Sequence, residues 1–248
     1  MWDDARQMNA TTLLLVLVAT VLLAWGIGSW LIRQPVFAFR EVVVSGPLER
    51  ASAPHLEAVI RDELAGTFFT MNLDRAGASL KRVPWVRGVA LRRQWPQRLE
   101  ITVEEHAPFA RWNDAALVNP QGEVFVATFN GELPSFAGPD GRSADVAARF
   151  REWSALLAPV ALSIQRIALS PRGGWQLSAR GAQGPLQIEL GREEPVARLQ
   201  RFVAVHGRTL GALERTGTRI EHVDLRYRSG FAARVPGFRE RTARKAPA

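Results

Sequence analysis

Cysteine is absent from this chain of 248 residues, and lysine occurs only at Lys81 and Lys245. Without cysteine there are no disulfide bonds and no thiolate metal sites. The four histidines are dispersed and show no metal-binding spacing with one another: His55, His106, His206 and His222. These absences exclude the common thiol-based and histidine-based centres.

Motifs for catalysis are also missing. The sequence contains no Gly-x-Ser-x-Gly, no glycine-rich phosphate loop and no His-Glu-x-x-His. Glu104-Glu105-His106 is the nearest approach to an acid–base cluster, but alternation along a strand sends the two glutamates to opposite faces. We therefore expect a protein that is not an enzyme and that has no cofactor, metal or small-molecule substrate.

Charge is absent from one long run near the start of the chain, between Arg6 and Arg33. Within it, residues 13–32 are almost wholly apolar, and twenty helical residues rise about 30 Å, the thickness of a bilayer's hydrocarbon core. The apolar region of a signal peptide is shorter, about 7–15 residues. Gly26-Ile27-Gly28 is only a weak cleavage site. The run therefore predicts a retained transmembrane helix over residues 11–32, preceded by a short tail, residues 1–10.

The flanking charges do not orient this span. Arg6 on one side is offset by Asp3 and Asp4, and the other side carries Arg33 and Arg40. Long domains cross a membrane largely regardless of such charges, so both orientations stay open at this point.

The formal net charge of +8 comes mostly from arginines scattered through strand-like segments. Their densest cluster is a basic C-terminal tail, residues 239–248. Scattered arginines are more typical of a solvated surface than of a nucleic-acid site, so we expect no nucleic-acid binding.

Residues 37–106 have the pattern of a small α+β unit in the order β-α-α-β-β. A β-branched strand, 39–44, precedes a helix capped by Ser52 and a second helix, 73–83, capped by Asn72 or Asp74. Val86–Arg93 and Leu99–Val103 then alternate as a hairpin. The unit is small, so Trp85 and Trp95 are expected to pack in its core.

Residues 107–238 read as a β domain with helices packed on one face. Short strands are expected at 117–118, 124–126, 164–169, 175–177 and 186–190. One helix is expected to be capped by Ser143 and to bury Val146, Phe150, Trp153 and Leu157. The other is expected to begin near Pro195, with one face formed by Val196, Leu199, Phe202 and Val203.

The segments between 37 and 235 resemble the FtsQ/DivIB family of bacterial cell-division proteins. The resemblance is carried by Val83-Pro84-Trp85-Val86, Leu91-Arg92-Arg93-Gln94-Trp95-Pro96, Leu99–Glu105, Val223-Asp224-Leu225-Arg226-Tyr227 and Ser229-Gly230. It implies that residues 37–106 form a POTRA domain and that the family's β domain follows. It also implies a cytoplasmic N-terminal tail, a single span of the inner membrane and periplasmic domains at the division septum.

The last strands of the chain are the best candidate for a functional site. From Val223 the sequence alternates with period two, which predicts a ribbon with one buried face that Ser229-Gly230 can bend into two strands. A terminal strand is often an edge strand, and an edge can accept a partner's strand. The alternative is a final core strand whose edge is protected by its arginines.

The family resemblance favours partner binding over a protected edge. It implies that this strand binds FtsB of the FtsB–FtsL complex, through Arg226, Tyr227, Arg228, Ser229, Gly230, Phe231, Ala232, Ala233, Arg234 and Val235. Other division proteins are implied partners of the POTRA domain, whose second strand, 86–93, offers another edge. We therefore expect a non-enzymatic division scaffold; the alternatives are a POTRA-containing transport or assembly factor and a membrane-tethered cell-wall protein.

Overall fold

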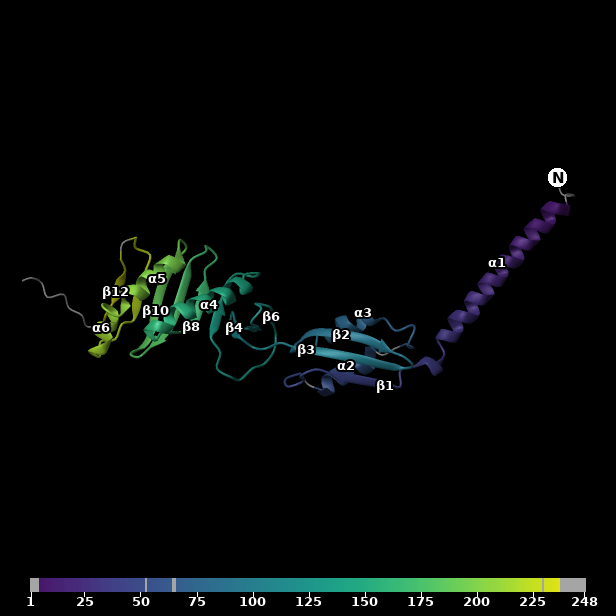
Figure 1. Cartoon of the computed structure of the whole chain (residues 1–248), viewed down its shortest axis with the longest axis horizontal. Coiled ribbons are helices and arrows are strands. Elements are labelled where there is room, and N and C mark those ends of the chain that lie inside the picture. Colours follow the sequence, from purple (N-terminus) through teal and green to yellow (C-terminus); the bar gives the residue numbers. More distant parts are fainter. Residues whose placement is uncertain (1–4, 52, 64–65, 229, 237–248) are drawn as a thin grey trace, which may run out of the picture. The chain divides into compact units, whose positions relative to one another are not determined.

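The computed structural model describes residues 5–51, 53–63, 66–228 and 230–236. Its backbone divides into two compact units, residues 1–106 and 107–248 (Figure 1). The α+β class expected from the sequence is confirmed, with one N-terminal apolar helix, a POTRA domain and a mixed sheet covered by helices.

The first element is a single long helix, α1, Ala5–Ile32 (Figure 1). Its segment Asn9–Ile32 is long and apolar enough to cross a membrane, and no part of it is buried by the rest of the chain. The helix begins before the expected span of 11–32, because nothing in residues 5–10 ends it. An apolar helix without protein around it has the character of a membrane span rather than of a core helix.

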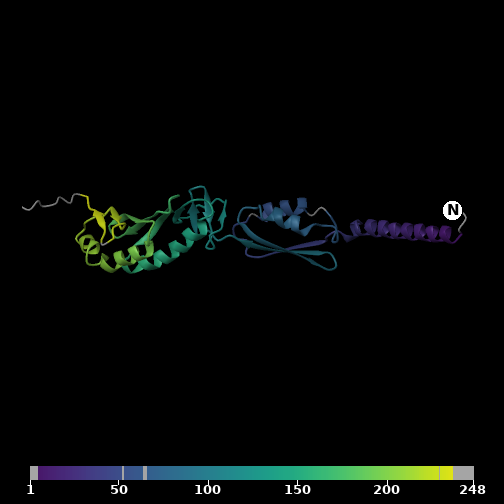
Figure 2. The same ribbon diagram turned by 90° about the horizontal axis from the view of Figure 1, so that it is seen from above.

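The POTRA domain follows the expected β-α-α-β-β order. After a 3₁₀ turn, Pro35–Phe37, its elements are β1 Glu41–Ser45, α2 Ala53–Glu63, α3 Leu73–Leu80, β2 Val86–Gln94 and β3 Arg98–Glu105. The sheet order is β1-β3-β2, with β1 parallel and β2 antiparallel to β3. Figure 2 shows both helices on one side of this sheet. Strands β1 and β2 are consequently its two edges.

Alternation along β3 builds the POTRA core as expected. Leu99, Ile101 and Val103 are all at most 1% exposed, and Leu56 of α2 and Leu80 of α3 are buried as well. Asn72 caps α3 by accepting a hydrogen bond from the Arg75 amide at 3.0 Å. The expected cap Ser52 lies outside the described residues.

The two tryptophans of this domain have opposite environments. Trp85 is buried, as expected, whereas Trp95 is 83% exposed, so its expected role in the core is wrong. Trp95 lies in the turn between β2 and β3, outside both strands. A turn residue has no facing layer to pack against, whatever its size.

In the described residues of the second unit, nine strands form one mixed sheet. Its strands are β4 Ala110–Trp112, β5 Ala116–Val118, β6 Val124–Phe125, β7 Ser135–Ala137, β8 Ser163–Leu169, β9 Trp175–Gly181, β10 Gly184–Gly191, β11 His222–Asp224 and β12 Ala232–Arg234. Their order is β12-β11-β10-β9-β8-β7-β4-β5-β6. The short strands β4 and β7 were not expected from the sequence. They pair in parallel with each other, and β7 also pairs in parallel with β8.

Helices α4, Ser143–Leu157, and α5, Pro195–His206, pack on one side of this sheet (Figure 2). A short helix, α6, Leu210–Arg215, follows α5, and a 3₁₀ turn, Ala158–Val160, follows α4. Trp153 of α4 is fully buried, with its ring centroid 5.0 Å from that of Trp175 in β9. Leu199 and Phe202 of α5 are also buried, as their helical spacing predicts.

Ser143 does not cap α4. It is the first helical residue, and its hydroxyl donates a 2.6 Å hydrogen bond to the carbonyl of Gly122. The expectation from local sequence is wrong because a loop distant in sequence supplies the partner. The helix is thereby tied to the turn that follows β5.

Candidate partner-binding edge

Strand β12 forms one edge of the nine-stranded sheet. It pairs antiparallel with β11, with His222 opposite Arg234 and Asp224 opposite Ala232. In the part of the chain that the structure describes, no strand pairs with its other side. An edge strand leaves a row of backbone N–H and C=O groups unpaired, and such a row can accept another strand.

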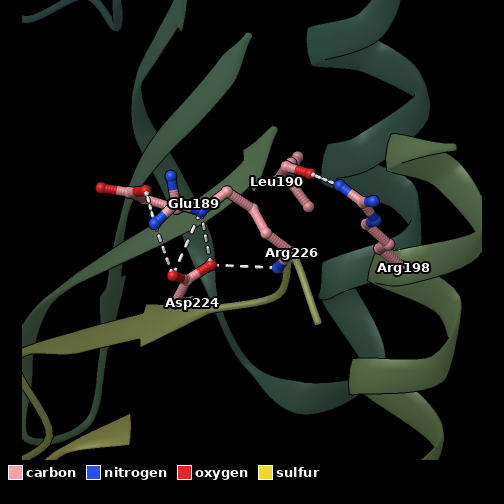
Figure 3. A network of polar contacts seen from close by, with 5 residues as sticks. All are labelled: Glu189, Leu190, Arg198, Asp224 and Arg226. Atoms are coloured by element: carbon pink, nitrogen blue, oxygen red, sulfur yellow. Dashed lines mark hydrogen bonds and ion pairs between the residues drawn. The ribbon is translucent and has the colours of Figure 1, made fainter. Parts of the chain in front are cut away.

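The end of β11 is held by an ionic network centred on Asp224 (Figure 3). Asp224 accepts hydrogen bonds from the Arg226 guanidinium, at 2.7 Å to Nη2 and 2.9 Å to Nε, and from the Arg226 backbone N–H at 3.0 Å. Arg226 Nη2 also lies 3.3 Å from Glu189 Oε2 in β10. The Leu225 amide donates to the Glu189 carbonyl at 2.8 Å. These bonds fix the direction in which the chain leaves β11.

Both charges of this pair are stabilised by the contact. The Arg226 side-chain hydrogen bond lowers the pKa of Asp224 below its usual range, although partial burial acts in the opposite direction. The hydrogen bond to Asp224 raises the pKa of Arg226. The guanidinium of Arg226, one of the expected partner-binding groups, is therefore already committed within its own chain.

A cavity of about 400 Å³ lies between α5 and the segment that joins β11 to β12. Its apolar wall includes Phe202, Val205, Leu225 and Phe231. The rings of Phe202 and Phe231 meet edge to face, with centroids 5.9 Å apart. Arg198, also at the cavity, donates a 2.6 Å hydrogen bond to the Leu190 carbonyl (Figure 3). The hollow is of a size for one or two apolar side chains of a partner.

The expected site residues gather along the edge with different exposures. Tyr227 is 56% exposed. The other exposed members are Arg226, Arg228, Gly230, Ala232, Ala233 and Arg234, and the half-buried members are Phe231 and Val235. Ser229 lies outside the described residues. The period-two pattern places Val223 and Leu225 in the core but fails at Tyr227, because the chain leaves the sheet after Asp224. It also fails at Ala233, which is exposed although it lies in β12 opposite Val223.

Three parts of this surface were not expected from the sequence: the burial of Asp224, the contribution of Phe202, and the cavity itself. Asp224 was assigned to the polar, outward phase of the strand, whereas it is only 9% exposed. An Asp two residues before an Arg at a strand end is a sequence signal for this local pairing. Phe202 was recognised as a core residue of its helix, and its proximity to Phe231 is visible only in the fold.

Metal chemistry finds no support in the described ranges, where no group of three or more His, Asp or Glu side chains is placed to hold an ion. His206 is 4% exposed, and its Nε2 lies 3.7 Å from Glu214 Oε2. Burial lowers the pKa of His206, and the Glu214 carboxylate opposes this shift. The histidine packs against Phe202, with ring centroids 5.2 Å apart, as part of the core behind the cavity.

Comparison with known proteins gives matches to both units. Residues 37–106 match the family model described as "POTRA domain, FtsQ-type", and residues 110–226 match "Cell division protein FtsQ/DivIB, C-terminal". Of the expected partner-binding residues, only Arg226 lies within the second match.

Curated relatives match nearly the whole length of the chain. A cell division protein FtsQ of Burkholderia pseudomallei is 39% identical over 247 residues, covering 96% of each chain. Proteins of the same name are 35% identical in Nitrosospira multiformis, covering 94% of this chain and 99% of that one, and 30% identical in Escherichia coli, covering 92% and 86%.

Proposed function

Because the chain belongs to the FtsQ/DivIB family of bacterial cell-division proteins, we propose that it recruits the FtsB–FtsL complex through strand β12. It is a non-enzymatic component of the division machinery. The proposed mechanism is recognition: the β domain, residues 107–238, offers an open sheet edge to a strand of FtsB. The single observation that carries the proposal is the edge position of β12 in the sheet.

Backbone pairing would supply affinity at this edge, and side chains beside it would supply the choice of partner. Tyr227 presents an exposed aromatic ring of a type enriched in binding hot spots. The cavity behind Phe231 can receive an apolar partner side chain. Tyr227 and Phe231 belong to the short stretch of chain whose direction the Asp224–Arg226 pair fixes where it leaves β11.

Exposed arginines beside β12 give the edge a positive character. Arg226 is paired with Asp224, whereas Arg228 and Arg234 make no ion pair with any described residue. Free guanidinium groups pair well with carboxylates, so acidic side chains of FtsB are the expected complement. Charge reversal at Arg228 or Arg234 should weaken binding more at low salt than at high salt.

The apolar helix provides the proposed location. Asn9–Ile32 would span the inner membrane once, with residues 1–10 in the cytoplasm, both folded domains in the periplasm, and the protein concentrated at the septum. Confinement to the bilayer raises the effective concentration of partners that share it. A transport factor and a tethered cell-wall protein are disfavoured, because both units match the cell-division family.

A proline in β12 tests backbone pairing directly. Ala233→Pro removes one strand donor, and Ala233→Val is the matched control because it keeps the N–H and suits a strand. We expect Ala233→Pro to abolish binding of FtsB–FtsL to the full-length protein in detergent, and Ala233→Val to retain it. Undiminished binding by the proline variant would refute strand addition.

Hydrogen exchange makes the same test on the unaltered chain. Adding FtsB–FtsL should slow amide exchange at 231–235 if a strand adds to this edge. If exchange slows only elsewhere, β12 is not the binding edge, whatever the stability of the proline variant.

A further inference from the structure

The turn between β2 and β3 carries a large apolar side chain that the POTRA core does not use. Trp95 is 83% exposed, more than any other large apolar residue whose exposure the structure describes. It borders a shallow hollow that it shares with Arg40, Pro96 and Gln97. An exposed indole ring on a folded domain is typical of a site that binds a partner with an apolar region and a polar boundary.

This turn is tied to the chain segment that leaves the apolar helix. The Gln97 side-chain amide donates to the carbonyl of Val36, and the Arg40 N–H donates to the Gln97 carbonyl at 2.9 Å. Val36 lies only four residues beyond Ile32, the last residue of α1, so the chain can carry it no more than about 14 Å from the helix end. The 3₁₀ turn Pro35–Phe37 shortens that distance further.

A second set of contacts fixes the same joint. The Thr67 hydroxyl donates to the carbonyl of Ile32 at 2.6 Å, and the Phe68 N–H donates to the Phe37 carbonyl at 2.7 Å. Phe69 packs edge to face on Phe37, with centroids 5.3 Å apart, and is still 50% exposed. The POTRA domain is therefore bonded to the helix end instead of being joined to it by a free linker.

The charges around the turn are favourable for an anionic surface. Glu41 is paired with Arg98 at 2.7 Å, and Glu100 accepts a 3.1 Å hydrogen bond from Gln94. Arg33 and Arg40 are exposed on the segment that leaves the helix. Arg98 thus neutralises Glu41, and Glu100 is held by the neutral amide of Gln94, while the charges of Arg33 and Arg40 face outward.

We propose that the β2–β3 turn is a second membrane contact, in which Trp95 inserts at the interface of the bilayer that α1 crosses. Tryptophan is enriched at this depth because its ring is apolar and its N–H can bond to water or headgroups. Anionic phospholipid is the occupant that the exposed arginines fit. Each arginine near an anionic surface strengthens the contact by about fivefold. The contact would fix the orientation of the POTRA domain on the membrane.

Because the chain has no cysteine, a single introduced cysteine can be labelled specifically to test this contact. A single nitroxide label is introduced by Gln94→Cys beside Trp95, and in a second protein by Glu49→Cys, next to the far end of β3. Full-length protein is placed in nanodiscs with and without phosphatidylglycerol, and label depth is measured from collisions with oxygen and with a water-soluble nickel complex.

The label at position 94 should report headgroup depth, and the label at 49 should report water. Adding Trp95→Ser should return position 94 to the value of position 49, whereas Leu48→Ser should leave it unchanged. Arg33→Gln and Arg40→Gln should each lower the ratio of docked to undocked protein by about fivefold in the anionic discs. If the collision data place the label at position 94 in water in both lipids, the proposal is overturned. It is also overturned if the label stays at headgroup depth in Trp95→Ser.

Fluorescence of the unlabelled protein provides a readout that needs no label. Lipids brominated near the headgroup should quench the wild-type protein more than Trp95→Phe, since the difference isolates the indole of Trp95. Equal quenching of the two proteins would place Trp95 in water, where a protein partner would have to cover it, and would refute the membrane contact.

Discussion

Truncation of Tyr227 separates partner binding from folding. The ring is 56% exposed, so Tyr227→Ala removes little from the packed structure and should change the free energy of unfolding by no more than about 0.5 kcal/mol. If FtsB covers this ring, the same change should weaken binding strongly. The two effects are measurable on one variant.

The size of the binding effect follows from the exposed area. A tyrosine offers roughly 200 Å² for burial, so an exposed fraction of 56% leaves about 110 Å² for a partner to cover. At about 25 cal/mol per Å² this area is equivalent to an upper limit of about 2.8 kcal/mol. Incomplete cover and the polar hydroxyl reduce the expected loss to about 2 kcal/mol, which is a roughly 30-fold rise in Kd.

The assay is titration of full-length variants in detergent with FtsB–FtsL, alongside denaturant unfolding of each variant. Val126→Ala is the matched control, because Val126 is 75% exposed in the same unit, next to the opposite edge strand β6. We expect Kd to rise for Tyr227→Ala alone. A Kd within twofold of wild type, or an equal rise for Val126→Ala, would refute the role assigned to Tyr227.

Two further predictions concern the β domain itself. Asn119 is fully buried, and its side-chain oxygen accepts the amides of Gln121 and Glu123 at 3.0 and 2.9 Å, so Asn119→Ala should lower the free energy of unfolding by about 2–3 kcal/mol; a loss below 0.5 kcal/mol would contradict that role. Burial lowers the pKa of His206, so as the pH falls below the ordinary value of 6.5 the unfolded chain takes up a proton before the folded chain does. The free energy of unfolding should therefore be greatest above pH 6.5 and should decrease as the pH falls below 6.5 and through the folded pKa. This decrease should be smaller in His206→Gln and unchanged in His222→Gln.

The local sequence pattern was sufficient to predict the secondary structure of segments that have one buried face. The alternation of Leu99, Ile101 and Val103 predicted β3, and the spacing of Leu199 and Phe202 predicted α5, because burial on one side imposes a period on the chain. The edge position of the last strand was inferred from the tendency of terminal strands to lie at sheet edges, and the sheet order agrees with it.

The local pattern was insufficient to predict contacts and burial where these depend on segments distant in sequence. Ser143 bonds to a carbonyl 21 residues away, which no cap rule anticipates. Trp95 was expected to pack in the core because the unit is small, but it lies in a turn that leaves its ring exposed. The cavity by Phe231 needs α5 to cross behind it, and helix packing of this kind is a property of the whole fold.

The parallel pairing of β1 with β3 has a consequence for how the protein folds during its synthesis. Glu41 lies opposite Arg98, 57 residues later in the chain, so β1 is synthesised before its strand partner exists. Until β3 has been synthesised, β1 has no neighbour in the sheet, and long-range closure of this kind is slow. A nascent chain halted before Arg98 should therefore present an unfolded, protease-sensitive segment directly after the apolar helix.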